Sequence, residues 1–134
     1  MKKTLIFDFD GTIADSFELV IDIVYQLTGI PHQNEQEVAR LRKLPLLKAA
    51  REMKIPFSRA PGLLLKGRQV MHDRISEVHP FVGVPETLHQ LQEVGYHMLV
   101  MSSNSEQNVR TFLRANNLEL YFDGVYGGAS IFSK

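Results

Sequence analysis

Two aspartates with one residue between them are the residues of this sequence that most specifically indicate chemistry. Asp8 and Asp10 follow the apolar run Thr4–Phe7, and Gly11 comes directly after them. The run predicts a short strand covered on both faces, with Asp8 at the carboxyl end, where ligands of open α/β sheets bind. Residues i and i+2 of an extended chain share one side, so the two carboxylates are expected to converge.

Such a pair of carboxylates is suited to metal binding or proton transfer. Like charges held together favour a divalent cation or push the two pKa values apart, and both outcomes serve catalysis. Gly11 permits a tight turn and lets backbone N–H groups approach a ligand closely. The alternative is a plain strand end followed by an Asp-Gly turn, which carries no chemistry.

A second polar cluster follows another apolar run. His97–Met101 predicts a buried strand, and the residues after it are Ser102, Ser103, Asn104 and Ser105. Ser105 is placed to cap a helix, and free N–H groups at a helix start attract anions. Ser and Asn at such a position are also ordinary helix caps. If the two strands are neighbours, an anion held here would lie beside Asp8.

The elements that position these clusters can be read from hydrophobic spacing, caps and breakers. Four helices are expected between the clusters: from Phe17 to Leu27 with Gly29 as the stop, from Asn34 to Arg42, from Pro45 to Ile55, and from about Pro61 to Val78. After them we expect a helix over 85–94, the strand His97–Met101, a helix from Ser105 to about Asn117, a short turn over 118–122 and a strand over 124–127.

This order of elements predicts an α/β fold. Strand, helix and strand in succession imply a parallel sheet with right-handed crossovers. We therefore expect a Rossmann-like, three-layer parallel-sheet core made of residues 1–15 and 80–134. An all-helical insert over residues 16–79, which we call the cap, interrupts it.

Composition narrows the classes of function. The chain has 134 residues, with Lys plus Arg equal to Asp plus Glu at 15 each, so no net charge attracts nucleic acid or an anionic membrane. It has no cysteine, which excludes disulfide scaffolds and Cys-ligated metal sites. No stretch approaches the roughly 20 apolar residues of a membrane span. We expect a cytoplasmic protein.

The residues from Asp8 to Ser16 resemble the first motif of the haloacid dehalogenase (HAD) superfamily, in its phosphoglycolate phosphatase-like and phosphomutase-like branch. Residues 100–105 resemble its second motif, with Ser103 and Asn104 as the Ser/Thr-Asn pair and Ser102 as the alternative register. Residues 80–88 are similar to the family's re-entry into the core, and the insert would be a C1-type cap.

The resemblance implies a Mg²⁺-dependent hydrolase that dephosphorylates a small phosphorylated metabolite through an aspartyl phosphate. Asp8 would be the nucleophile and Asp10 the acid and base, and both would hold the Mg²⁺. Gly11, Ser103 and Asn104 would hold the phosphoryl group. Lys134 resembles the third-motif lysine, which would neutralise charge at the nucleophile.

Two departures keep other functions open. The family's acidic fourth motif does not occur in these 134 residues, so the core is expected to be C-terminally truncated. The family places the first strand centrally, so its outer edge would be open here and could mediate self-association. The alternatives are a sugar phosphomutase of the same superfamily and a catalytically incomplete fragment acting as a binding or assembly module.

Overall fold

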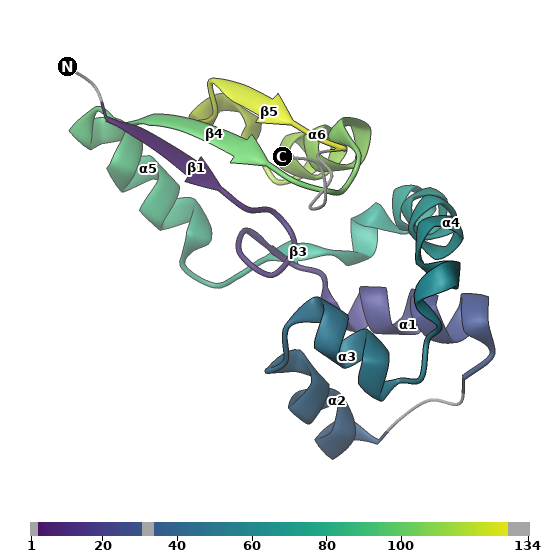
Figure 1. The fold of residues 1–134 in the computed structure, drawn as a ribbon. Helices are drawn as coiled ribbons and strands as arrows, with labels where there is room; N and C mark the ends of the chain where they lie inside the picture. Colours follow the sequence, from purple (N-terminus) through teal and green to yellow (C-terminus); the bar gives the residue numbers. More distant parts are fainter. Residues whose placement is uncertain (1–2, 31–33, 129–134) are drawn as a thin grey trace.

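A parallel sheet of three strands sets the frame of the chain (Figure 1). The computed structural model describes residues 3–30 and 34–128. Strands β1 (Thr4–Phe7), β4 (His97–Met101) and β5 (Gly124–Tyr126) lie in the order β1-β4-β5, and both pairings are parallel. Phe7 pairs with Val100, which pairs with Val125. The predicted α/β class and parallel sheet are confirmed.

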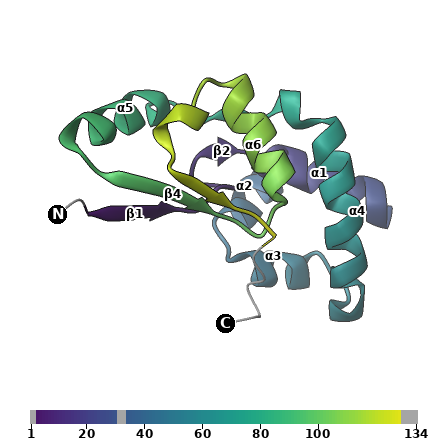
Figure 2. The ribbon, with the colours of Figure 1, turned by 90° about the horizontal axis from the view of Figure 1, so that it is seen from above.

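Two helices cover one face of this sheet. Figure 2 shows α5 (Val84–Val94) and α6 (Glu106–Ala115) on the same side of the strands. Right-handed crossovers that move in one direction across a sheet place their helices on the same face. The main core forms between these layers and includes Val100, Leu88 and Phe112, all of which are at most 1% exposed.

The opposite face of the sheet corrects one prediction. Thr4–Phe7 was expected to be covered on both faces, but no residue of β1 is fully buried and Ile6 is 61% exposed. Met101 and Tyr126, on the neighbouring strands, are also exposed. Among the described residues β1 pairs with β4 alone. The strand thus has more apolar side chains than the described residues bury.

The insert is helical, as predicted. It comprises α1 (Phe17–Thr28), α2 (Glu35–Arg42), α3 (Leu46–Glu52) and α4 (Ala60–Asp73), with 3₁₀ turns at Phe57–Arg59 and Ile75–Glu77. Gly29 ends α1 with a φ of 73°, and the Asn34 side chain accepts a hydrogen bond from the Glu37 N–H at 2.8 Å. These are the stop and the cap that the sequence indicated.

Apolar packing ties the insert to the sheet. Ile23 of α1 and Met71 of α4 belong to the main core, while a second cluster made of Ile21, Tyr25, Leu41, Ala49 and Met53 lies within the insert. The domain boundaries at residues 15 and 80 remain a prediction. Within the described residues, none of the helices has both the length and the apolar character needed to cross a membrane.

Two short strands that the sequence did not reveal join the ends of the insert. β2 (Ala14–Asp15) pairs antiparallel with β3 (His79–Pro80), and the Phe81 N–H donates to the Ile13 carbonyl at 3.1 Å. Strands of two residues have no detectable period, so only the tertiary contact defines them. This pairing brings the start and the end of the cap together beside the acidic turn.

We expect substitution of Phe9 to destabilise both the fold and the site. Its side chain is 0% exposed and meets the Phe112 ring edge-on, at 5.1 Å between centroids. Phe9→Ala should lower the free energy of unfolding by about 3–5 kcal/mol in urea denaturation, because it leaves a cavity beneath the turn. Leu120→Ala, at a side chain that is 90% exposed, should change it by less than about 0.5 kcal/mol. A Phe9→Ala protein as stable as Leu120→Ala would contradict this account.

Candidate active site

The acidic turn is built around one carbonyl oxygen. The Phe9 carbonyl accepts hydrogen bonds from the N–H groups of Thr12, Ile13 and Ala14 at 3.0–3.2 Å. Gly11 adopts a φ of 81°, and its N–H donates to the Ala14 carbonyl at 2.9 Å. Gly11 therefore shapes the turn, and in this structure its N–H is engaged within it.

Asp10 is held from two separate elements. Ser16, at the start of α1, donates to Asp10 Oδ1 at 2.7 Å, and Asn104, after β4, donates from Nδ2 to Asp10 Oδ2 at 3.3 Å. Burial raises the pKa of Asp10, the two hydrogen bonds oppose that rise, and the nearby charge of Asp8 adds to it. A carboxyl group with a raised pKa is suited to proton transfer near neutral pH.

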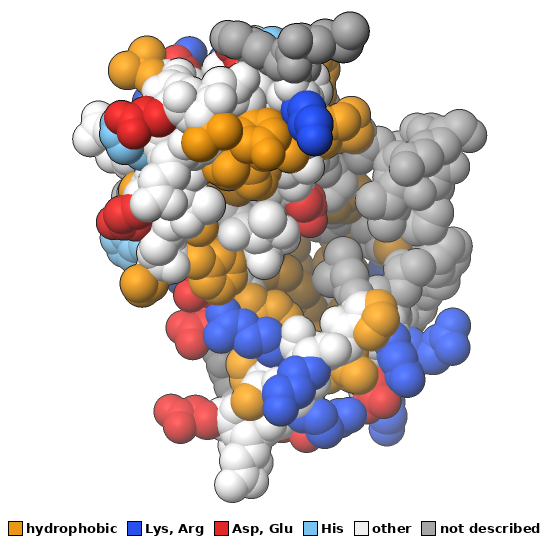
Figure 3. Space-filling view, turned by 90° about the vertical axis from the view of Figure 1, so that its left-hand side faces the viewer, with side chains coloured by type: hydrophobic (Ala, Val, Ile, Leu, Met, Phe, Trp, Pro, Cys, Tyr) orange, Lys and Arg blue, Asp and Glu red, His pale blue; other side chains and the backbone are white. Residues whose placement is uncertain are grey.

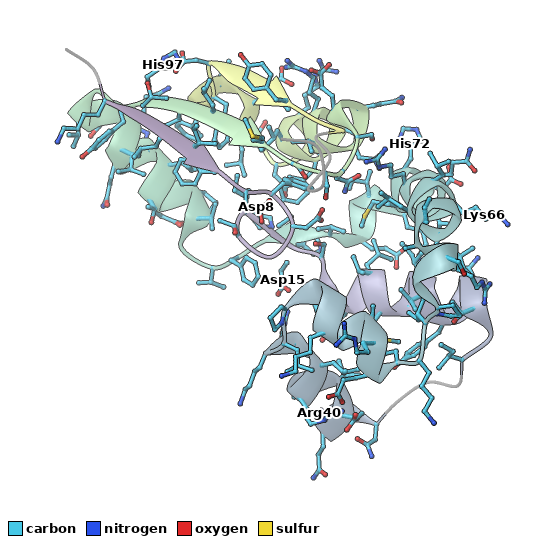
Figure 4. All side chains as sticks on the ribbon, in the orientation of Figure 1. Asp8, Asp15, Arg40, Lys66, His72 and His97 are labelled. Carbon is cyan, nitrogen blue, oxygen red and sulfur yellow. The ribbon has the colours of Figure 1, made fainter. Side chains whose placement is uncertain are left out.

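Asp8 lies at the end of β1 and its side chain is exposed (Figure 4). Its Oδ1 accepts the N–H of Phe9 at 2.9 Å. Its negative charge adds to the rise in the pKa of Asp10, two residues further along the chain. Asp8 and Asp10 thus lie together where β1 leads into the turn, Asp8 exposed and Asp10 partly buried.

The loop after β4 lies next to this turn. Ser102 is 3% exposed, and its Oγ accepts the Asn104 N–H at 3.0 Å, while the Ser105 Oγ caps α6 by accepting the Asn108 N–H at 3.1 Å. Ser103 is only partly buried. Because the Ser102 hydroxyl is engaged inside the loop, Ser103 is the better placed of the two hydroxyls for a ligand.

A glycine contact brings a third segment to the same loop. The Gly128 N–H donates to the Asn104 carbonyl at 2.7 Å. A Cβ atom at Gly127 would lie 2.0 Å from the Glu106 nitrogen, so the close approach of this segment to α6 requires glycine. Lys134, the predicted charge-neutralising residue, lies outside the described residues.

Two residues at the site escaped the sequence reasoning. Arg68 of α4 donates from a terminal guanidinium nitrogen to the Ser103 carbonyl, and its buried Nε has no hydrogen-bond partner among the described residues. No local pattern connects Arg68 with Ser103. Asn108 of α6 is 1% exposed, and its position four residues before the buried Phe112 could have marked it as a polar residue on an apolar helix face.

The oxygen donors of the acidic turn fit a hard divalent cation. The Asp10 side chain is engaged with Ser16 and Asn104, whereas the exposed Asp8 carboxylate accepts the Phe9 N–H and is the more accessible ligand. The repulsion between Asp8 and Asp10 is the electrostatic feature that a cation relieves. Among residues 3–30 and 34–128, no three His, Asp or Glu side chains lie together in a way that could hold a metal ion, so water and substrate oxygens would complete the coordination.

A cavity in the cap lies apart from Asp8 and Asp10. It has a volume of about 770 Å³ and is lined by residues of α1 and α2 and by residues 74 and 77. Asp15 lies at this cavity, but Asp8 and Asp10 do not line it. There Asp15 forms an ion pair with Arg42 at 2.5 Å, and the Arg42 guanidinium lies over the Phe17 ring. The cavity is therefore a feature of the cap and is separate from the acidic turn.

Comparison with known proteins identifies the class. The family model for haloacid dehalogenase-like hydrolases matches residues 5–134, so the chain belongs to that family. The chain is 30% identical over 135 residues to phosphoglycolate phosphatase of Synechococcus elongatus. This alignment covers 98% of the chain and 64% of that protein. It is also 30% identical over 129 residues to the pyrophosphatase PpaX of Bacillus anthracis, covering 92% of the chain and 58% of that protein.

A solved structure shows the same arrangement. A predicted phosphatase from Clostridium acetobutylicum superimposes with a TM-score of 0.73 at 25% sequence identity, over 95% of this chain and 61% of that one. The chain thus spans about 60% of the length of the relatives it matches. The resemblance to the HAD superfamily that the motifs indicated is confirmed.

We expect the raised pKa of Asp10 to appear as a pH dependence of stability. A folded-state pKa above the unfolded value means that the contribution to stability is full at low pH and is lost as pH rises through the folded-state value. In metal-free buffer, the free energy of unfolding of Asp10→Asn should therefore rise relative to that of the wild type as pH increases from below the ordinary carboxyl range to neutrality.

Thermal or urea unfolding at several pH values measures this difference, and Asp73→Asn, at an exposed site on α4, is the matched control. The control should follow the wild type across the range. A constant difference in the free energy of unfolding between Asp10→Asn and the wild type at all pH values would show that the pKa of Asp10 is not raised.

Proposed function

We propose that this chain carries the catalytic apparatus of a Mg²⁺-dependent phosphatase that hydrolyses a small phosphomonoester through an aspartyl phosphate. The observation that supports this most directly is the placement of the exposed Asp8 beside the partly buried Asp10, directly after β1 and next to the loop that follows β4. A nucleophile needs access to substrate, and a proton-transfer group needs a raised pKa. The two aspartates meet these separate requirements.

The proposed reaction has two steps. In the first, a carboxylate oxygen of Asp8 attacks phosphorus, the bond from phosphorus to the ester oxygen breaks, and Asp10 gives its proton to the leaving alcohol. In the second, Asp10 takes a proton from water as that water attacks the phosphorus of the aspartyl phosphate. Inorganic phosphate leaves and Asp8 returns as a carboxylate.

The remaining residues would position the phosphoryl group. The Ser103 hydroxyl and the N–H groups at the start of α6 would bind its oxygens, and Lys134 would neutralise charge at Asp8. Asn104 would act by holding Asp10, since its side chain donates to that carboxylate. Bound Mg²⁺, held by Asp8 and the Asp10 carbonyl, would supply charge neutralisation for the phosphoryl oxygens.

The charge distribution of one part of the cap, residues 34–68, supports an anionic substrate. Residues 34–68 contain nine Lys and Arg but only three Asp and Glu, although the whole chain has equal numbers of each sign. Figure 3 shows these basic side chains gathered over the lower part of the molecule, where α2 and α3 lie. A local positive field raises the concentration of phosphorylated metabolites near the cap. The names of both relatives, a phosphoglycolate phosphatase and a pyrophosphatase, agree with this substrate class.

One observation favours the alternative of a binding or assembly module. Among the described residues, the sheet face opposite α5 and α6 carries three exposed side chains: Ile6 on the edge strand β1, Met101 on β4 and Tyr126 on β5. Apolar sheet faces and open strand edges associate with other chains. Under this alternative the chain would bind phosphate without turning over the ester.

Phosphate release separates the two functions. With Mg²⁺ and a panel of small phosphomonoesters, the wild type should release phosphate, and Asp8→Asn should lower kcat at least about 1000-fold because the amide is not a nucleophile. A chelator should abolish release, and Asp73→Asn should retain wild-type rates. Equal activity in Asp8→Asn would exclude the aspartyl-phosphate route. Phosphate binding without release in the wild type would favour the alternative.

A further inference from the structure

A continuous set of hydrogen bonds connects the cap helix α4 to the candidate acid and base. It runs from α4 to Asn108 on α6, from Asn108 to Asn104, and from Asn104 to Asp10. Figure 4 shows His72 on α4 close to α6. We propose that Asn108 is a positioning residue that couples docking of the cap helix to the orientation of Asp10. This inference rests on the proposed function, in which Asp10 transfers protons.

Asn108 stands at the centre of these hydrogen bonds. Its side-chain Nδ2 donates to the Asn104 Oδ1 and to the backbone carbonyl of Arg68, each at 3.0 Å. Both hydrogens of the amide are thus used, and the side chain is 1% exposed. Since a buried polar group that loses its partner carries a desolvation cost, the position of Asn108 is tied to both acceptors.

The orientation of Asn104 follows from that of Asn108. The Asn104 Oδ1 accepts from the Asn108 Nδ2 and from the Ser105 N–H at 2.8 Å. Because two N–H donors point to this oxygen, the orientation of the Asn104 amide is fixed, and its Nδ2 points to Asp10. If the amide turned by half a rotation, its donor would face two donors and its oxygen would face a carboxylate.

The cap side of the network is equally defined. The Asn108 Oδ1 lies 3.1 Å from His72 Nδ1, and because the Asn108 amide hydrogens are used elsewhere, the His72 nitrogen must be the donor. Arg68, one turn earlier on α4, also donates to the Ser103 carbonyl. The cap helix α4 therefore makes two kinds of contact here: Arg68 donates to the Ser103 carbonyl in the loop after β4, and the His72 ring and the Arg68 carbonyl bind Asn108 on α6.

Docking of α4 thus supplies two of the three hydrogen-bond partners that the Asn108 side chain has among the described residues, the Arg68 carbonyl and the His72 ring. When α4 moves away from α6, Asn108 loses both, and its hold on Asn104 weakens. Asp10 then keeps its contact with Ser16 but loses a well-oriented donor from Asn104. The acid and base is therefore fully oriented only while the cap helix is docked.

The first experiment measures how well the hydrogen bonds of Asn104 protect its side-chain NH₂ protons from exchange with water. In NMR spectra of the full chain, exchange of the Asn104 side-chain NH₂ protons with water should rise at least about 10-fold in Asn108→Ala. The matched control is Asn116→Ala, at the end of the same helix, where the side-chain amide donates to the Phe112 carbonyl. That control should leave the Asn104 exchange rate within about twofold of wild type, and an equal response in both variants would overturn the proposal.

A second variant acts from the cap side and does not disturb the core. The His72 side chain is exposed, so His72→Ala should fold even if Asn108→Ala does not. It should still shift the Asn104 side-chain NH₂ signals, because the change passes through Asn108. Unchanged Asn104 signals in His72→Ala would overturn the proposal.

Kinetics separate this inference from the proposed function. In an active wild type, Asn108→Ala should lower kcat about 10-fold and change KM by less than about twofold, since it disturbs proton transfer more than binding. Altered Asn104 signals in a chain that releases no phosphate would overturn the proposed function alone. An unchanged kcat in a folded Asn108→Ala enzyme would overturn the positioning role while leaving the phosphatase assignment intact.

Discussion

The parallel pairing of β1 with β4 is the interaction on which the rest of the structure depends. The register that sets Phe7 against Val100 places Asp8, at the end of one strand, beside the loop that begins at Ser102 on the other. More than 90 residues separate these segments in sequence. Burial of Val100 and of Phe9, both 0% exposed, stabilises this register, so the same packing that forms the core also assembles the site.

The helical insert is joined to the site at its first residue and through its last α-helix, and its two ends are paired with each other. Ser16 precedes α1 and donates to Asp10, while Arg68 of α4 donates to the carbonyl of Ser103. The β2–β3 pairing holds these two ends of the insert together. The cap is therefore connected to the groups that the proposed reaction uses, and its movement relative to the sheet would change the hydrogen bonds that those groups receive.

Asp10 shows how stability and chemistry oppose each other here. Burial of its carboxyl group disfavours the charged form, and the hydrogen bonds from Ser16 and Asn104 offset only part of that cost. A chain selected for stability alone would replace such a group. The same burial produces the raised pKa that proton transfer requires, so the destabilising feature and the proposed catalytic feature have one physical cause.

The sequence by itself determined the features that depend on neighbouring residues. The Gly29 stop, the Asn34 cap and the Ser105 cap depend on hydrogen bonds within one turn of helix, and Asp8 and Asp10 are placed by the strand and turn that contain them. Tertiary structure decided the rest. The exposure of β1, the β2–β3 pairing and the contacts of Arg68 and Asn108 all depend on segments far apart in the chain. Local propensity and periodicity carry no information on such contacts, because they form only when the whole fold brings their partners together.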